Sequence, residues 1–271
     1  MPMLERPGGP IWYEITDLTP PWIETPPTML FHHGVGINAK TWNGWLPALA
    51  DRYRLVRMDM RGCGQSSVPA PGFMWSMDLL AADALAVAQA AGAQQFHWVG
   101  ESIGGTIGFY VATRSPAALL SLRACSTSHR GAAINRVKEW RAFIDQHGMA
   151  AWSAMMMPHR LHRAHVSEEA YRWFEREQAT ASASVTLDLA DLLIGTDLAP
   201  LLPSIAQPAL LFAPGESPFV PMSVMREIHA LIPDSEIQSF PSVRHALAFS
   251  HGAACSHALR NFLARRERSG G

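Results

Sequence analysis

The chain has 271 residues, of which 48% are hydrophobic, and its 22 basic and 23 acidic side chains leave a formal net charge of −1. A chain of this length and composition can bury a sizeable core, either as one α/β domain with an insertion or as two small domains. Its near-neutral charge gives no electrostatic reason to expect nucleic acid or an anionic membrane as a partner.

Short apolar runs alternate along the chain with longer segments of helical pattern, as is typical of a parallel sheet with crossover helices. After apolar runs at 28–31 and 55–58, the alanine- and leucine-rich segment 76–91 predicts a helix. Ser76 is its expected N-cap, and Gly92 can adopt the left-handed conformation that ends it. Further strands are predicted at 96–99, 119–124, 210–213 and 237–240, and a final amphipathic helix at 253–265.

The interval 132–206 breaks this alternation, because it contains no convincing strand and has a helical pattern throughout. It includes three tryptophans and three consecutive methionines at 155–157. We therefore interpret it as an inserted helical cap, so that residues 1–131 and 207–271 form one α/β core. Prolines at positions 200, 203 and 208 mark the return to the sheet.

The strongest chemical motif is Gly100-Glu-Ser-Ile-Gly104, which stands between a predicted strand and a predicted helix. Glycines two positions on either side of Ser102 leave space for a sharp turn with strained backbone angles. Such a turn presents the serine hydroxyl above the sheet, at the positive end of the following helix. Because the motif has a strand before it and a helix after it, we interpret Ser102 as a nucleophile rather than as part of a plain tight turn.

A second motif, Phe31-His-His-Gly-Val-Gly36, follows the first predicted strand. A His-Gly pair at this point lets the chain turn over the sheet edge, where backbone N–H groups can face an oxyanion developing on a substrate. Val35 and Ile103 would supply two such donors, and the loss of one donor typically costs on the order of 10²–10³ in rate. The alternative is a glycine turn in which the two histidines only pack or form hydrogen bonds.

His245 follows the last predicted strand and precedes the last predicted helix. A hydrolytic serine needs a base within hydrogen-bond reach, and neutral imidazole is the usual one near pH 7. Most single histidines have no catalytic task, but the position of His245 in the chain order favours the role of base.

In this order, the serine turn, the His-Gly loop, the segment Asp59-Met-Arg-Gly-Cys-Gly-Gln-Ser66 and the late histidine resemble the α/β-hydrolase superfamily. The resemblance implies an α/β-hydrolase fold, with a mostly parallel central sheet flanked by helices and an inserted helical cap. The chain is most similar to the 3-oxoadipate enol-lactonase and small carboxylesterase branch. The resemblance implies Ser102 as nucleophile, His245 as base and later acid, and Val35 and Ile103 as the oxyanion hole. Asp59 and Arg61 are expected to hold their loop as scaffold.

The superfamily pattern also implies an aspartate in the loop after the strand 210–213, and alignment on Pro221 places Ser217 at that position. Three interpretations are open. In our working hypothesis Glu216 orients His245 through a one-residue shift of the loop. In the second, another carboxylate such as Glu101 serves; in the third there is no acid, and Ser217 or a backbone carbonyl orients the histidine. Loss of the aspartate of a serine-protease triad typically costs about 10⁴ in kcat.

We therefore expect a serine esterase or lactonase that forms an acyl-enzyme on Ser102 and uses no metal or organic cofactor. The alternatives are a C–C bond hydrolase or cofactor-free oxygenase of the same fold, or a degenerate ligand-binding member. The substrate is expected to be a small molecule that is apolar or contains a ring, because thioethers suit an adaptable apolar pocket. Arg160 and Arg163 would suit a substrate carboxylate at the pocket rim. The histidines at 159, 162 and 165 are a poor metal site, since arginines separate them and no Cys or Asp is near.

The three cysteines are widely spaced, odd in number and without a C-x-x-C pair. We therefore expect no disulfide framework and a reducing compartment. The N-terminal residues show no basic region followed by an apolar run, so no signal peptide is expected. No apolar stretch reaches the length of a membrane span. These features predict a cytoplasmic protein that does not bind membranes.

Overall fold

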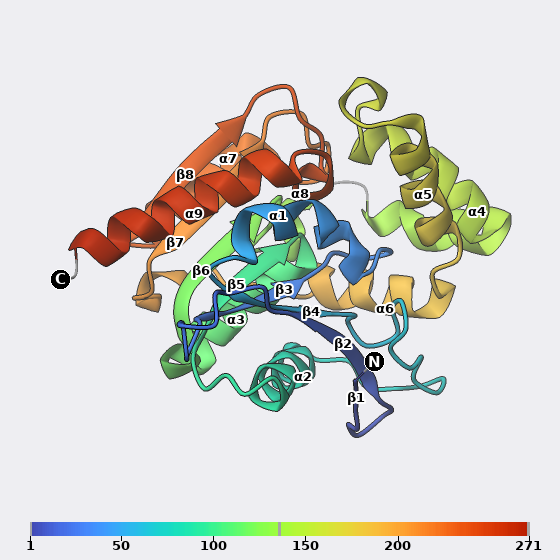
Figure 1. Ribbon diagram of the computed structural model, residues 1–271. Helices are drawn as coiled ribbons and strands as arrows, with labels where there is room; N and C mark the ends of the chain where they lie inside the picture. The colour runs from blue at the N-terminus through green and yellow to red at the C-terminus, as the bar shows by residue number, and fades with distance from the viewer. Residues whose placement is uncertain (1, 135–136, 270–271) are drawn as a thin grey trace.

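The central sheet has eight strands in the order β1-β2-β4-β3-β5-β6-β7-β8, in a computed structural model that describes residues 2–134 and 137–269 (Figure 1). β1 pairs antiparallel with β2, and β2 pairs antiparallel with β4. The pairs from β4 to β8 are all parallel. This arrangement confirms the predicted mostly parallel sheet. The strands are Met3–Leu4, Ile11–Thr16, Thr28–His32, Arg54–Met58, Phe96–Glu101, Leu119–Cys125, Ala209–Pro214 and Ser235–Phe240, numbered β1 to β8.

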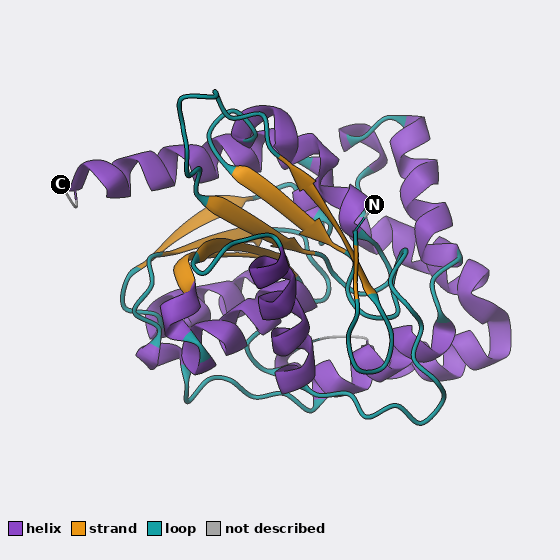
Figure 2. Ribbon diagram, turned by 60° about the horizontal axis from the view of Figure 1, so that its bottom comes forward, coloured by secondary structure: helices purple, strands orange, loops and turns teal. Residues whose placement is uncertain are grey.

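Helices cover both faces of the sheet (Figure 2). Because side chains alternate along a strand, Met29 and Phe31 of β3 face one side, where α1 and α9 pack, while Leu30 faces the side covered by α2 and α3. The helices are Leu46–Leu49, Met77–Ala90, Ile103–Arg114, Trp140–Arg160, Glu168–Ala179, Ala183–Ile194, Met222–Leu231, Leu247–Ser250 and Gly252–Ser269, numbered α1 to α9. Two buried layers of apolar side chains therefore enclose the sheet and hold its carboxyl edge in place.

The six predicted strands and the two predicted helices are all present, with ends that differ by a few residues. The Ser76 hydroxyl accepts the Leu79 N–H at 3.1 Å, and Gly92 has a φ of 82°, so both expected ends of α2 are observed. The antiparallel strands β1 and β2 were not predicted. They precede the first crossover helix, so they lie outside the strand–helix alternation on which the prediction rested.

The interval interpreted as a cap contains α4, α5 and α6, and among its described residues no strand forms. Gly148, with a φ of 77°, interrupts the helical backbone of α4. Met157 and Leu161 at the end of α4 pack with Ile37 and Ala246, which follow β3 and β8. The cap, of which residues 132–134 and 137–206 are described, therefore contacts the carboxyl edge of the sheet through the end of α4.

Asp59 and Arg61 both hold their loop, as expected, but each residue binds a different part of the chain. The Asp59 carboxylate accepts the N–H groups of Ala39 at 2.7 Å and Gln65 at 2.8 Å. Arg61 instead forms a buried ion pair at 2.8 Å with Asp83 of α2. The Arg61–Asp83 ion pair thus ties this loop to α2.

The three cysteines are buried and none forms a disulfide. Over residues 2–134 and 137–269, no helix is both long enough and apolar enough to cross a membrane.

Candidate active site

Ser102 lies at a tight turn between β5 and α3. Its φ of 56° falls in the left-handed region, which non-glycine residues seldom adopt. A side chain at Gly104 would place its Cβ 2.2 Å from the carbonyl oxygen of His32, and one at Gly100 would approach the Gly104 carbonyl oxygen to 2.3 Å. The two glycines are therefore required by close backbone approach, and they let the turn press against the end of β3.

The His-Gly loop after β3 lies directly beside Ser102. A Cβ at Gly34 would be 3.2 Å from the Cβ of Ser102. The N–H groups of Val35 and Ile103 donate no hydrogen bond to any described residue. Since Ile103 is the first residue of α3, its N–H is also one of the helix donors left without a partner in the helix. Both backbone donors are therefore without an acceptor among the described residues, and the loop that carries Val35 lies against Ser102.

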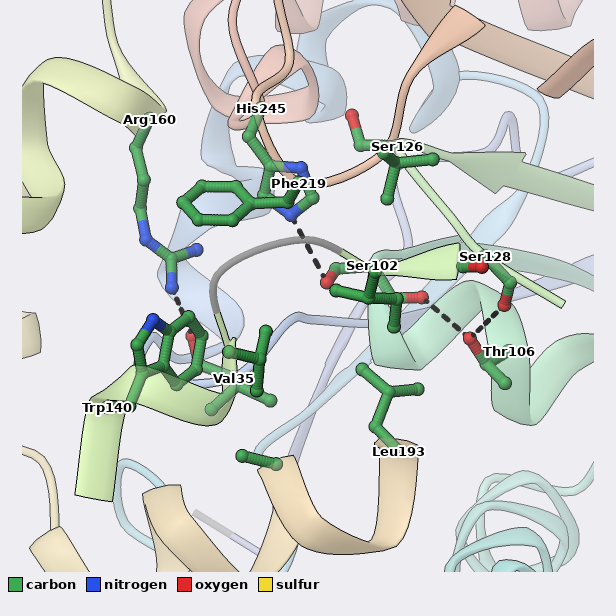
Figure 3. A pocket seen from close by; sticks show the side chains of 14 residues that line it. Val35, Ser102, Thr106, Ser126, Ser128, Trp140, Arg160, Leu193, Phe219 and His245 are labelled. Carbon is green, nitrogen blue, oxygen red and sulfur yellow. Dashed lines mark hydrogen bonds between the residues drawn. The ribbon is translucent and has the colours of Figure 1, made fainter. Parts of the chain in front are cut away.

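His245 lies between the hydroxyl groups of Ser102 and Ser217, and Figure 3 shows its contact with Ser102. Its Nε2 is 3.3 Å from Ser102 Oγ, and its Nδ1 is 3.0 Å from Ser217 Oγ. The ring packs edge-on against Phe219, with centroids 5.0 Å apart. The structure therefore brings Ser102 and His245 together and places Ser217 on the far side of the imidazole.

The Ser217 hydroxyl can fix the tautomer of this histidine. Its oxygen accepts the Val220 N–H at 3.1 Å. When Nδ1 of His245 carries the proton, the same oxygen accepts that N–H as well, which leaves Nε2 free to take the Ser102 proton. In that tautomer Ser217 would hold the ring as an aspartate does, but without its negative charge.

Glu216 does not form the contact with His245 that our working hypothesis requires. Its carboxylate pairs instead with Nε2 of His162 in the cap at 2.7 Å, and 46% of its side chain is exposed. Glu101, the other carboxylate considered, accepts the Ala248 N–H at 2.9 Å. Over the described residues, no Asp or Glu forms a hydrogen bond with His245.

A small cavity of about 20 Å³ lies above Ser102, enough for roughly one water molecule. Its lining residues are Val35, Ser102, Thr106, Ser126, Ser128, Ile134, Val137, Trp140, Arg160, Ala190, Leu193, Phe219, Val220 and His245. A neighbouring cavity of about 90 Å³ shares Trp140 and Phe219 with it and is also lined by Met155 and Met156. Trp140 and Phe219 therefore separate the cavity above Ser102 from the larger one.

Sequence reasoning missed Phe219 and Thr106. Phe219 packs on the His245 ring, and Thr106 Oγ1 donates to the Ser128 carbonyl at 2.8 Å beside the cavity. The only sequence clue is their position, two residues after Ser217 and four residues after Ser102.

Arg160 is the one guanidinium group among the described lining residues. It is 5% exposed, and its Nη2 donates to the Val35 carbonyl at 3.3 Å. Burial lowers the pKa of Arg160 to about 10 and raises the pKa of Glu101 to about 7. Burial, with the nearby charge of Arg160 as the second cause, lowers the pKa of His245 to about 3. The imidazole is therefore neutral near pH 7, and no carboxylate of a described residue forms a hydrogen bond that would stabilise its protonated form.

The cap histidines do not share one helix, because α4 ends at Arg160 and the chain leaves it as an extended segment at Leu161. His162 pairs with Glu216, and His165 packs edge-on against His251 at 5.2 Å. In the part of the chain that the structure describes, no three His, Cys, Asp or Glu side chains gather closely enough to hold a metal ion.

The family model described as "alpha/beta hydrolase fold" matches residues 27–252. Pimeloyl-[acyl-carrier protein] methyl ester esterase of Methylococcus capsulatus is 36% identical over 97 residues, 35% of each chain. The match thus spans about a third of that relative's length. A protein of Klebsiella pneumoniae named "Putative carbamate hydrolase RutD" is 26% identical over 255 residues, 90% of this chain and 93% of that one.

Solved structures share the fold over nearly the whole chain. The enol-lactonase of Burkholderia xenovorans has a TM-score of 0.85 at 20% identity, and the match covers 97% of this chain and all of that one. A hydrolase of Pseudomonas aeruginosa has a TM-score of 0.84 at 22% identity and covers 97% of both chains. At these identities the likeness is one of fold.

Proposed function

This chain belongs to the alpha/beta hydrolase fold family, and from that membership we propose that it is a serine hydrolase acting on an ester or lactone. The observation that carries the proposal is the bridge made by His245, whose two ring nitrogens contact Ser102 at 3.3 Å and Ser217 at 3.0 Å. The similar proteins, which are named as an esterase, a putative carbamate hydrolase and an enol-lactonase, support hydrolysis at a carbonyl group.

The first half-reaction acylates Ser102. Its Oγ attacks the substrate carbonyl carbon while Nε2 of His245 takes the hydroxyl proton. The electron pair of the C=O bond moves to oxygen, and the N–H groups of Val35 and Ile103 stabilise the resulting oxyanion. The intermediate then expels the alcohol oxygen, which takes the proton from His245. The products of this step are the free alcohol and an ester of Ser102; in a lactone the alcohol stays attached to the acyl group.

The second half-reaction releases the acyl group. His245 removes a proton from a water molecule, and the water oxygen attacks the acyl carbon. The same backbone donors stabilise the second oxyanion. Ser102 leaves with the proton that His245 returns, and the carboxylic acid departs. The neutral imidazole needed to begin each half-reaction follows from the low pKa of His245.

Ser217 makes this a slow site for ordinary esters. An aspartate would stabilise the imidazolium that forms in both half-reactions, and its loss in a serine-protease triad costs about 10⁴ in kcat, roughly 5 kcal/mol. The hydroxyl keeps the orientation of the ring but offers no charge. We therefore expect turnover of activated esters and strained lactones, whose leaving groups need less assistance.

The proposal is tested by intact mass spectrometry with 4-nitrophenyl butyrate, using Ser102→Ala as the control for acylation elsewhere. We expect one butyryl group on the wild-type protein, located on Ser102 by peptide mapping, and none above background in the variant. Turnover that persists in Ser102→Ala would instead favour proton abstraction by His245, as in a C–C bond hydrolase or cofactor-free oxygenase. Binding without acylation would favour a ligand-binding protein.

A further inference from the structure

Two arginines near the end of α4 have opposite environments. Arg163 is 64% exposed and forms an ion pair with Glu168 at 2.9 Å. Arg160, three residues earlier, is buried beside the cavity above Ser102 and forms no ion pair with any described residue. Of the two arginines, only Arg160 therefore faces the site without an ion-pair partner among the described residues.

We propose that Arg160 binds a carboxylate of the substrate, so that the substrate is an ester or lactone carrying a free carboxylate on the acyl side. This inference rests on the proposed function, because it concerns the same cavity and the same reacting carbonyl.

The guanidinium of Arg160 lies 5.9 Å from the Trp152 ring centroid but lacks the hydrogen-bond partners that a buried arginine normally has. Its Nε has no hydrogen-bond partner among the described residues, and its Nη2 reaches only the Val35 carbonyl at 3.3 Å. A buried cation without a counter-ion is costly, and a bidentate carboxylate is the ligand that a guanidinium fork fits best. The empty donors therefore favour an anionic group that comes with the substrate.

The nearest internal carboxylate does not fill this place. Glu101 interacts with Arg160 electrostatically, but its Oε1 accepts the Ala248 N–H, and no hydrogen bond joins it to the arginine. Burial raises the pKa of Glu101 to about 7, so near neutral pH a large part of it is uncharged. Glu101 thus offsets the charge of Arg160 only in part.

The rest of the cavity restricts where a substrate charge can go. Apart from Arg160 and His245, its described lining consists of serine and threonine hydroxyls and apolar side chains. Figure 3 shows Arg160 reaching toward Val35 on the side of Ser102 away from Thr106 and Ser128. Arg160 donates to the carbonyl of Val35, the residue whose N–H is one of the two proposed oxyanion donors, so a carboxylate bound to Arg160 would lie near the reacting carbonyl.

The bound carboxylate would also assist catalysis. The charge of Arg160 is one cause of the low pKa of His245, and it opposes the imidazolium that forms when Ser102 loses its proton. An anion on Arg160 would offset that charge. The substrate would in this way supply part of the stabilisation that an aspartate at position 217 would otherwise give.

The test compares two esters that differ only in charge, 4-nitrophenyl hemiglutarate and its methyl ester. The rate measured with Ser102→Ala protein, which lacks the serine hydroxyl at the turn, is subtracted as the background rate of hydrolysis. We expect wild-type kcat/KM to favour the anionic ester by about 10- to 100-fold, the value of a charged hydrogen-bonded pair. In Arg160→Gln this preference should disappear, and Arg160→Lys should restore part of it.

Arg163→Gln is the matched control, because it removes a charge three residues away that does not line the cavity. It should keep the wild-type preference for the anionic ester. An equal preference in wild type and Arg160→Gln, or its loss in Arg163→Gln, would overturn the inference.

A second measurement covers the case in which Arg160→Gln does not fold. In wild-type protein, monomethyl glutarate should inhibit labelling of Ser102 by a neutral fluorophosphonate at about tenfold lower concentration than dimethyl glutarate. Equal inhibition would contradict an anion site at Arg160.

Failure of the inference and failure of the proposed function give different results. If Ser102 is labelled but the enzyme shows no preference for the anionic ester, the proposed hydrolase is supported and the anion site is contradicted. Unlabelled Ser102 with Arg160-dependent binding of glutarate, measured by calorimetry, leaves the anion site without the hydrolase.

Discussion

The turn at 100–104 and the loop at 215–221 contact the same histidine from opposite sides, and different forces determine them. At the first, close backbone approach fixes the structure, since a side chain at Gly104 would place its Cβ 2.2 Å from the His32 carbonyl oxygen. At the second, the backbone is also held, because the Glu216 N–H donates to the Val243 carbonyl at 2.9 Å. What decides the chemistry there is which of two adjacent side chains turns inward.

Close packing thus determines the turn that carries Ser102, whereas the group that faces His245 depends on the directions of two neighbouring side chains. Ser217 turns inward to His245, and Glu216 turns outward to His162. A hydroxyl and a carboxylate can both accept the Nδ1 proton, but only the carboxylate stabilises the imidazolium. The predictions below separate these two contributions.

The largest effect is expected from Ser102→Ala. Removal of the attacking oxygen leaves the backbone donors and the cavity intact, so kcat for 4-nitrophenyl butyrate should fall by roughly 10³-fold or more. Initial rates at saturating ester, with a thermal melt to show that the variant is folded, check this expectation. Retention of more than a tenth of the wild-type kcat would show that the turn at 100–104 does not supply the nucleophile.

Ser217→Asp should increase activity. An aspartate at this position can accept the same Nδ1 proton and adds the missing charge, so we expect kcat for 4-nitrophenyl butyrate to rise about 10- to 100-fold, part of the 10⁴ that such a carboxylate contributes in serine proteases. Glu216→Asp is the matched control, because it shortens the acid that already stands in this loop and faces His162. No gain in Ser217→Asp, with an unchanged melting temperature, would mean that the loop does not present residue 217 to the ring as described.

The dependence of kcat/KM on pH below neutrality should differ between the wild type and Ser217→Asp. A base is active when unprotonated, so the pKa of about 3 for His245 predicts a nearly flat kcat/KM from pH 8 down to pH 5 in the wild type. In Ser217→Asp the added negative charge raises the pKa of the imidazole, and the rate should begin to fall within that window. A wild-type limb near pH 6.5 would contradict the low pKa.

The sequence predicts strands β3 to β8 and the tight turn at Ser102 well, because both depend on local requirements of the chain. Alternating apolar runs indicate β3 to β8, and glycines around Ser102 indicate a turn that no larger residues permit. The sequence does not show whether Glu216 or Ser217 faces His245. The directions of these side chains depend on backbone hydrogen bonds between segments far apart in the chain, such as that from Glu216 N–H to the Val243 carbonyl. Likewise, the sequence does not distinguish Arg160 from Arg163. In the structure α4 ends at Arg160, so Arg160 faces the cavity and Arg163 faces solvent.

The central claim is that Ser217, and not Glu216, orients His245. We would measure the rate at which a neutral fluorophosphonate labels Ser102, by intact mass, in wild type, Ser217→Ala and Glu216→Gln. Loss of one neutral hydrogen bond to the ring predicts a rate about 5- to 10-fold lower in Ser217→Ala, with Glu216→Gln within about twofold of wild type, as for an exposed ion pair. A rate that collapses in Glu216→Gln and is unchanged in Ser217→Ala would contradict the account.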